Sequence, residues 1–175
     1  MKYIKEYNEY IDPFNEDDWD EVEIGSFLTW LKSKYSDESK WKYITKIDCH
    51  YNNLTDLIGI DKLINLEELY CYHNQLTKLN VTKNINLNVL YCDNNQLTEL
   101  NVSNNINLVY LSCHRNQLTK LGVTKNIKLR NLFCEHNQLT ELDISKNIEL
   151  EYLFYYHNQL TELDVSKNIK LIKNT

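Results

Sequence analysis

The sequence predicts a repeat solenoid that is mostly β in content, and three observations support this fold class. A segment of 21 residues recurs almost unchanged along the chain. Within each copy, apolar residues alternate with polar ones, which is the period of a strand and not of a helix. The 175 residues include only three Gly and one Pro, where an average composition would supply roughly twenty. The chain must therefore turn by another means in each copy.

The copies follow the pattern LxxLxCxxNQLTxLxVxxNIx. Near-identical copies begin at Leu66, Leu87, Leu108, Leu129 and Leu150. A divergent copy of 22 residues opens at Ile44, and a truncated copy opens at Leu171. One copy cannot cover its own leucine side chains, so the copies must stack. We therefore assign residues 44–175 to the repeats and residues 1–43 to an N-terminal helical cap.

The alternation within a copy predicts which side chains form the interior. Leu69 and Cys71 share one face of a short strand, and Leu79 and Val81 share one face of a second extended pass. Copies stacked at the strand spacing of about 4.8 Å would bury these residues against their counterparts above and below. The interior is therefore predicted to be a continuous hydrophobic column.

Asparagine recurs at two fixed positions, and we interpret both as the residues that turn the chain. An amide can pair with backbone groups left unpaired at a corner, and stacked amides are also able to bond to each other. The first column is Asn52, Asn74, Asn95, Asn116, Asn137 and Asn158. The second column is Asn84, Asn105, Asn126, Asn147 and Asn168.

The five cysteines occupy one inward position, 21 or 22 residues apart. They are Cys49, Cys71, Cys92, Cys113 and Cys134. Thiols in a line about 20 Å long cannot surround one zinc ion, and parallel Cβ vectors do not suit a disulfide. We therefore predict buried thiols, with no metal and no cofactor. Tyr155 takes the same position in the last full copy, where its ring is expected to help close the column.

The first 43 residues break the repeat. Phe27, Trp30, Leu31 and Tyr35 fall at i, i+3, i+4 and i+8, which predicts one helical face that covers the first coil. Residues 12–23 hold seven acidic side chains and no basic one, without the Gly and Glu spacing of a calcium loop. A solvated acidic loop is favoured, and a docking site for a basic partner is the alternative.

The motif LxxLxCxxN, followed by LTxLxVxxN, resembles the leucine-rich repeat superfamily in its short, 21-residue bacterial type. Residues 52–57 (NNLTDL) and 63–66 (LINL) are similar to internalin-like repeats. The resemblance covers residues 44–175. It implies a right-handed coil with a concave parallel sheet of about six or seven short strands. It also implies relatives in intracellular bacteria and large DNA viruses.

The variable outward positions of the predicted sheet are rich in aromatic residues. Each of the six copies offers three outward positions, which form a middle column that begins at Asp48 and flanking columns that begin at Lys46 and His50. Eight of these eighteen positions are aromatic: Tyr70, Tyr72, Tyr91, Tyr110, Phe133, Tyr152, Phe154 and Tyr156. Tyr70, Tyr91, Phe133 and Phe154 are expected to be exposed to solvent. Rings at this density are unusual on a solvated sheet and are common in protein interfaces. We therefore predict a non-catalytic protein-protein interaction module, and the alternative is that the rings merely stack to cover the sheet.

Two other functions stay open, the substrate-recognition part of an enzyme such as a ligase and a purely structural repeat scaffold. No Ser, Cys or Asp is expected in a loop beside a candidate base, no Gly-rich phosphate loop occurs and the cysteines point inward, so we predict no catalysis. The net charge of −6 opposes nucleic acid as a partner, because phosphate binding depends on Lys and Arg.

The ends of the chain yield two further expectations. Residues 1–10 are charged and lack the apolar core of a signal peptide, and no apolar run is long enough to span a membrane. We expect a soluble cytoplasmic protein without a membrane partner, located in the host cytoplasm if it comes from an intracellular pathogen or virus. Because the last copy stops after five residues, we also expect a homodimer through an uncapped C-terminal end, or a longer native chain.

Overall fold

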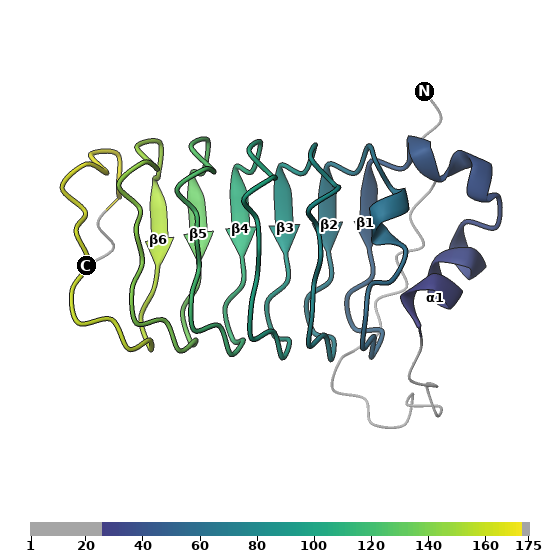
Figure 1. Cartoon of the computed structure of the whole chain (residues 1–175), viewed down its shortest axis with the longest axis horizontal. Helices are drawn as coiled ribbons and strands as arrows, with labels where there is room; N and C mark the ends of the chain where they lie inside the picture. Colours follow the sequence, from purple (N-terminus) through teal and green to yellow (C-terminus); the bar gives the residue numbers. More distant parts are fainter. Residues whose placement is uncertain (1–25, 173–175) are drawn as a thin grey trace.

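The computed structural model describes residues 26–172 as a column of stacked coils that share one parallel sheet (Figure 1). Each coil contributes one strand of three residues. The strands are β1 (Lys46–Asp48), β2 (Glu68–Tyr70), β3 (Val89–Tyr91), β4 (Tyr110–Ser112), β5 (Asn131–Phe133) and β6 (Tyr152–Phe154). They lie side by side in chain order, so each strand pairs with the equivalent residues of the next copy. The predicted repeat solenoid is confirmed.

The interior of the column is built from the residues that the alternation singled out. In the coil that contains β2, Leu69, Cys71 and Val81 are fully buried, and Leu79 is nearly so. The same positions are buried in the coils of β3, β4 and β5. Cys92 is buried beneath the sheet, while the neighbouring Tyr91 faces outward from it. The register of the predicted interior is therefore confirmed.

The second extended pass differs from the prediction. Leu79 and Val81 are buried as expected, yet within residues 26–172 this pass forms no paired strand. Between them, Asn80 accepts a hydrogen bond from the backbone N–H of Thr82 at 3.2 Å, which is a local side-chain turn. Asn101, Asp143 and Asp164 occupy the same place in later coils and accept from the N–H two residues on. These turns use local hydrogen bonds in place of a second sheet.

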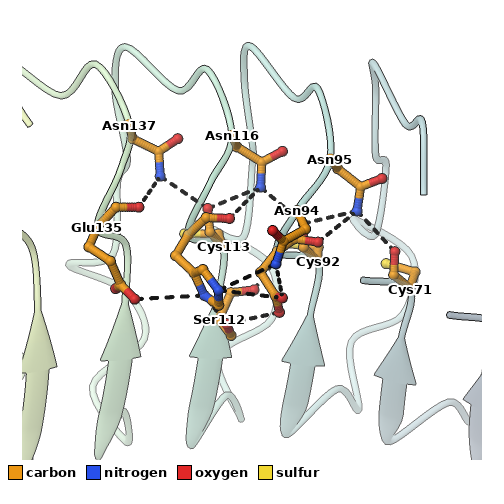
Figure 2. Close-up of polar contacts among 11 residues, drawn as sticks. Cys71, Cys92, Asn94, Asn95, Ser112, Cys113, Asn116, Glu135 and Asn137 are labelled. Atoms are coloured by element: carbon orange, nitrogen blue, oxygen red, sulfur yellow. Dashed lines mark hydrogen bonds and ion pairs between the residues drawn. The ribbon is translucent and has the colours of Figure 1, made fainter. Parts of the chain in front are cut away.

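The first asparagine column links each coil to its neighbours. The Nδ2 of Asn116 donates to the carbonyl oxygens of Cys92 and Cys113, both at 3.0 Å. Its Oδ1 accepts the backbone N–H of Leu97 at 2.9 Å. Figure 2 shows the same two Nδ2 contacts for Asn95 and the contact of Asn137 with Cys113, and Asn137 also donates to the carbonyl oxygen of Cys134 at 3.1 Å. The amides thus pair backbone groups that no strand partner reaches, as predicted from the fixed position of Asn.

The second asparagine column is only half satisfied. The Nδ2 of Asn126 donates to the carbonyl oxygens of Val102 at 3.0 Å and Asn105 at 2.8 Å. Its Oδ1 is buried and has no hydrogen-bond partner in the described part of the chain. The same holds for Asn84, Asn105, Asn147 and Asn168. The expected bonds between stacked amides are not found in residues 26–172 for either column, because backbone carbonyls occupy the amide hydrogens.

A left-handed residue follows every strand and completes the turn. Its φ lies between 49° and 54° in the last five coils, at His73, Asn94, Arg115, His136 and His157. This region is sterically costly for residues with a Cβ, and Asn tolerates it better than most. The sequence pattern did not predict these turns, because the side chain at this position varies from coil to coil.

The N-terminal part of the described chain joins the same core. Helix α1 (Phe27–Lys34) is followed by the short 3-10 helix η2 (Glu38–Tyr43), and both lie at the β1 end of the column (Figure 1). Another 3-10 helix, η3 (Ile60–Lys62), belongs to the first coil. Phe27, Leu31 and Trp41 are buried in the cluster that contains the repeat interior. The Nε1 of Trp41 donates to the carbonyl oxygen of Tyr35 at 2.8 Å, which fixes η2 against the end of α1.

The predicted helical face is therefore present, whereas the boundary between residues 43 and 44 stays a prediction. The segments 1–10 and 12–23, singled out in the sequence for their charge, lie outside the described residues. In residues 26–172, the helices are too short and too polar for any of them to cross a membrane.

The coil of β6 is less buried than those before it. Leu153, Leu160 and Leu163 are only partly buried, and Val165 is 44% exposed. Tyr155 is 40% exposed, and a role of its ring in closing the column stays a prediction. These positions pack against the preceding coil on one side only, which explains their exposure.

Candidate protein-binding face

The outward side chains of the sheet form a row of stacked rings across β2 to β6. The ring centroids of Tyr70 and Tyr91 are 5.0 Å apart, and those of Tyr91 and Tyr110 are 4.5 Å apart. The row continues from Tyr110 to Phe133 at 5.3 Å and from Phe133 to Phe154 at 5.1 Å. All four pairs are near parallel, with interplanar angles of 16° to 28°. We call these five residues the aromatic row.

The aromatic row changes column where it crosses β4. Ser112, the last residue of β4, belongs to the middle column of outward positions. Its side chain is too small to span the space between the rings of Tyr91 and Phe133 on either side. Tyr110, from the flanking column of the same strand, stacks on both Tyr91 and Phe133 and so continues the row. Ser112 is consequently almost fully buried. Alignment of the copies alone does not reveal this crossing, which arises because a large flanking residue lies beside a small central one.

The rings are half-buried and not fully exposed, which corrects the expectation for Tyr70, Tyr91, Phe133 and Phe154. Each ring covers part of its neighbour, because the strand spacing of about 4.8 Å is close to the stacking distance of aromatic rings. The other predicted binding residues lie to either side of the row. Tyr72 and Tyr152 are half-buried, and Tyr156 is exposed.

The hydroxyls of Tyr70 and Tyr110 have raised pKa values. Burial raises the pKa of Tyr70 to about 12, helped by its hydrogen bond to Glu68 at 3.1 Å. Burial is also the main cause of the raised pKa of Tyr110, with smaller contributions from a hydrogen bond to Tyr91 and from the charges of Tyr91, Asp93 and Glu135. Because the Tyr70 hydroxyl already donates its proton to Glu68, it can offer a bound molecule only its acceptor lone pairs.

A polar cluster lies beside the aromatic row, where β3, β4 and β5 end (Figure 2). The Oγ of Ser112 is 3.0 Å from Oδ1 of Asp93 and 3.0 Å from Nδ1 of His114. The imidazole lies between two carboxylates, with Nε2 3.6 Å from Asp93 Oδ2 and Nδ1 3.9 Å from Glu135 Oε1. Asn94 donates to Asp93 Oδ2 at 2.9 Å. We call Asp93, Ser112, His114 and Glu135 the polar cluster.

The polar cluster corrects the expectation that no Ser or Asp lies beside a candidate base. One outward column contains Asp93, His114 and Glu135, each two residues past the end of its strand. Alignment of the copies therefore places these three residues side by side. Ser112 is nonetheless a poor candidate nucleophile. The residue is only 2% exposed, and its hydroxyl donates a hydrogen bond to Asp93. A substrate therefore cannot reach the oxygen without rearrangement of the face.

The cysteines are free, buried thiols in one line beneath the sheet. Burial raises the pKa of Cys134 to about 12 and those of Cys71, Cys92 and Cys113 well above the usual thiol range. A protonated thiol is neither a good nucleophile nor a metal ligand. Within residues 26–172, no group of three or more His, Cys, Asp or Glu side chains is arranged to hold a metal ion.

Solved structures of other proteins share this fold. The functional domain of InlJ from Listeria monocytogenes, described as including a cysteine ladder, aligns over 77% of this chain with 41% identity and a TM-score of 0.75. The chain is a leucine-rich repeat solenoid of the short bacterial type. A leucine-rich repeat protein of Leptospira interrogans aligns over 71% of the chain with 29% identity and a TM-score of 0.67.

The internalin InlF of Listeria monocytogenes shows the same fold at 23% identity, with a TM-score of 0.72 over 79% of the chain. The leucine-rich repeat chain described here spans 30% of the InlJ chain, 43% of the InlF chain and 35% of the Leptospira chain. No protein-family model matches it, and no curated protein matches its sequence.

Proposed function

We propose that the chain is a non-catalytic protein-binding module whose partner docks on the sheet face. The observation that carries this proposal is the aromatic row, a continuous ribbon of five rings that runs across five strands and is half-exposed along its length. Leucine-rich repeat and internalin structures with the same architecture support a role as an interaction scaffold.

The geometry of the row suits binding. Stacked rings are already restrained before a partner arrives, so an interface formed on them loses little side-chain entropy. Tyr and Phe also supply large contact areas, and such residues dominate the binding energy of many interfaces. Tyr72, Tyr152 and Tyr156 widen the aromatic surface on both sides of the row.

Stacking also fits the alternative that the rings only cover the sheet, and a double substitution separates the two. We expect Tyr91→Ala with Phe133→Ala to abolish capture of a protein partner from the native host. Loss of the four stacked pairs, at about 0.5–1.5 kcal/mol each, should lower the free energy of unfolding by about 2–6 kcal/mol. Capture is therefore measured at a temperature at which circular dichroism shows both proteins folded.

The matched control removes two exposed apolar side chains from another side of the column. Ile85 and Ile127 are 54% and 55% exposed, so Ile85→Ala with Ile127→Ala deletes surface of similar character without touching the sheet. This control should capture the partner as well as the unaltered chain does. If the folded aromatic variant also captures it, the partner does not dock on the row.

We propose a cytoplasmic or otherwise reducing location, since five free thiols suit a compartment in which disulfides do not form. Nucleic acid and membranes are not proposed as partners, given the net charge of −6. A homodimer through the coil of β6 is a further proposal, supported by the exposure of Tyr155 and Val165. Light scattering over a hundredfold concentration range tests it, and a particle that stays monomeric throughout would exclude the dimer.

A further inference from the structure

The charges on the sheet face are unbalanced. Its eighteen outward positions include four carboxylates, Asp48, Glu68, Asp93 and Glu135, and a single lysine, Lys46. Lys46 pairs with Glu68 at 3.3 Å, on the first two strands of the sheet. The two carboxylates of the polar cluster lie on the far side of Tyr70 and Tyr91 from this lysine. The centre of the face is therefore acidic.

Asp93 and Glu135 are also unusually buried for carboxylates. They are only 6% and 8% exposed, and carboxylates at this depth normally pair with a cation. Within residues 26–172, the only side chain that forms an ion pair with either of them is His114. One imidazole thus lies between two carboxylates. Its separations of 3.6 Å and 3.9 Å exceed the 2.7–2.9 Å typical of a charge-assisted hydrogen bond.

Glu135 shows the shortage of donors directly. One carboxylate oxygen, Oε1, faces His114, and the other, Oε2, has no hydrogen-bond partner in the described part of the chain although it is fully buried. Asp93 is better served, because Ser112 and Asn94 each reach one of its oxygens. A buried carboxylate oxygen without a donor is destabilising, so the site would gain from a donor that a ligand supplies once the side chain of His114 moves aside.

We propose that the polar cluster is the binding site for a basic side chain of the protein partner, with the arginine guanidinium as the best fit. This inference rests on the proposed docking of a partner on the sheet face, and it adds the chemical character of that partner. The guanidinium is planar, always charged and carries donors on opposite edges, so it can reach both carboxylates when it takes the place of the imidazole that lies between them.

The surroundings of the cluster favour such a cation. Phe133 is the strand neighbour of Ser112, and Tyr110 lies on the same strand as Ser112. Aromatic rings attract a guanidinium group through stacking and cation–π contact. The charges of Asp93 and Glu135 both act on the Tyr110 hydroxyl, which places the ring within the field of the two carboxylates. His114 is the partly exposed member of the cluster, with a quarter of its side chain accessible, and it marks the point of entry.

A displayed library of random peptides tests the proposal on the full chain. Selection on the unaltered protein is followed by removal of every clone that also binds the Tyr91→Ala, Phe133→Ala variant. The remaining clones depend on the aromatic row. We expect these clones to share an arginine or lysine. In a synthetic peptide from a clone that carries arginine, replacing this arginine by neutral citrulline should weaken binding about tenfold or more.

The reciprocal change removes the charge from the protein. Asp93→Asn with Glu135→Gln keeps the shape of both side chains, and we expect it to make the arginine and citrulline peptides bind equally. The matched control, Glu99→Gln with Glu141→Gln, removes the same charge from exposed positions elsewhere on the column and should preserve the difference. The citrulline comparison on the unaltered chain does not depend on whether the neutral variant folds.

The outcomes separate this inference from the proposed function. Clones that need the aromatic row but carry no basic residue, or that bind the citrulline peptide equally well, would overturn the cation site and leave docking on the row intact. A selection in which no clone depends on the row would overturn the proposed function and the cation site together.

Discussion

The interior of the column and its sheet face are built from the same copies but follow different rules. Inside, Leu, Cys and Asn recur at fixed positions, and in the central coils each is followed by the same residue in the next coil. On the face, neighbouring residues differ, as with Tyr91, Ser112 and Phe133 in one column. Repetition makes the interior stable because one packing solution serves every coil. Variation makes the face specific, because the polar cluster occurs only once in residues 26–172.

The largest expected effect is alkaline unfolding caused by the interior thiols. Their folded-state pKa values are raised by burial, so the unfolded chain loses its thiol protons first as the pH rises. The stabilisation is complete below the unfolded thiol pKa of about 8.5 and is lost as the pH climbs toward the folded values. Each thiol should then cost about 1.4 kcal/mol per pH unit.

Urea unfolding at pH 8 and pH 10 measures this loss. Cys113→Ala should make the dependence on pH shallower by the contribution of one thiol, although the cavity lowers stability at both values. An unfolding free energy that is the same at pH 8 and pH 10 would show that the thiols do not control alkaline stability.

The next effect concerns a leucine at the centre of the column. Leu111 lies on β4, is fully buried and has coils on both sides. Leu111→Ala should lower the free energy of unfolding by about 2–5 kcal/mol through lost burial and the cavity it leaves. Chemical denaturation gives the value directly. A loss below about 1 kcal/mol would mean that the coils can close around the gap, contrary to a tightly packed column.

The two asparagine columns sharpen the comparison within the interior. Asn116 uses both its donor and its acceptor, whereas the Oδ1 of Asn126 has no partner in residues 26–172. Asn116→Ala should cost about 1–3 kcal/mol through unpaired backbone groups. Asn126→Ala should cost less, because it also removes an unsatisfied oxygen. Equal losses in urea unfolding would show that the buried Oδ1 finds a donor in solution.

The smallest effect is expected on the solvated side of the column. Lys125 is exposed, and no ion pair or hydrogen bond of its side chain is found in residues 26–172. Lys125→Ala should change the free energy of unfolding by less than about 0.5 kcal/mol. A larger change, measured in the same urea titration, would mean that charges on this side contribute to stability in a way that their exposure conceals.

The sequence was sufficient for the interior because the copies are nearly identical. Once Leu69 and Cys71 were placed on one face, every later coil followed, and burial of the cysteines predicted free thiols. The unsatisfied Oδ1 of Asn126 was not predictable, since both asparagine columns look alike in the alignment. Only the positions of the carbonyls in the preceding coil distinguish the two columns.

The face was predictable in composition but not in arrangement. The alternation of residues correctly predicts that the eight aromatic side chains face outward. It does not predict their exposure, which depends on which rings stack. Tyr110 leaves its own column because Ser112 is small, and this choice is made by neighbours 19 to 23 residues away in the chain. The polar cluster escaped notice for the same reason: Asp93, His114 and Glu135 belong to three different copies and have meaning only together.

The reach of the asparagine side chains has a consequence for how such a chain can change length. The Nδ2 of Asn116 bonds only within its own coil and the one before, as do its equivalents. Whole segments of 21 residues could therefore be duplicated or deleted in the gene, because the equivalent residues of the coils brought together would re-form the bonds that are lost. Each event would move the groups on the face apart or together by one strand spacing of about 4.8 Å. The distance between two recognition groups on the face can therefore change only in fixed steps of one coil.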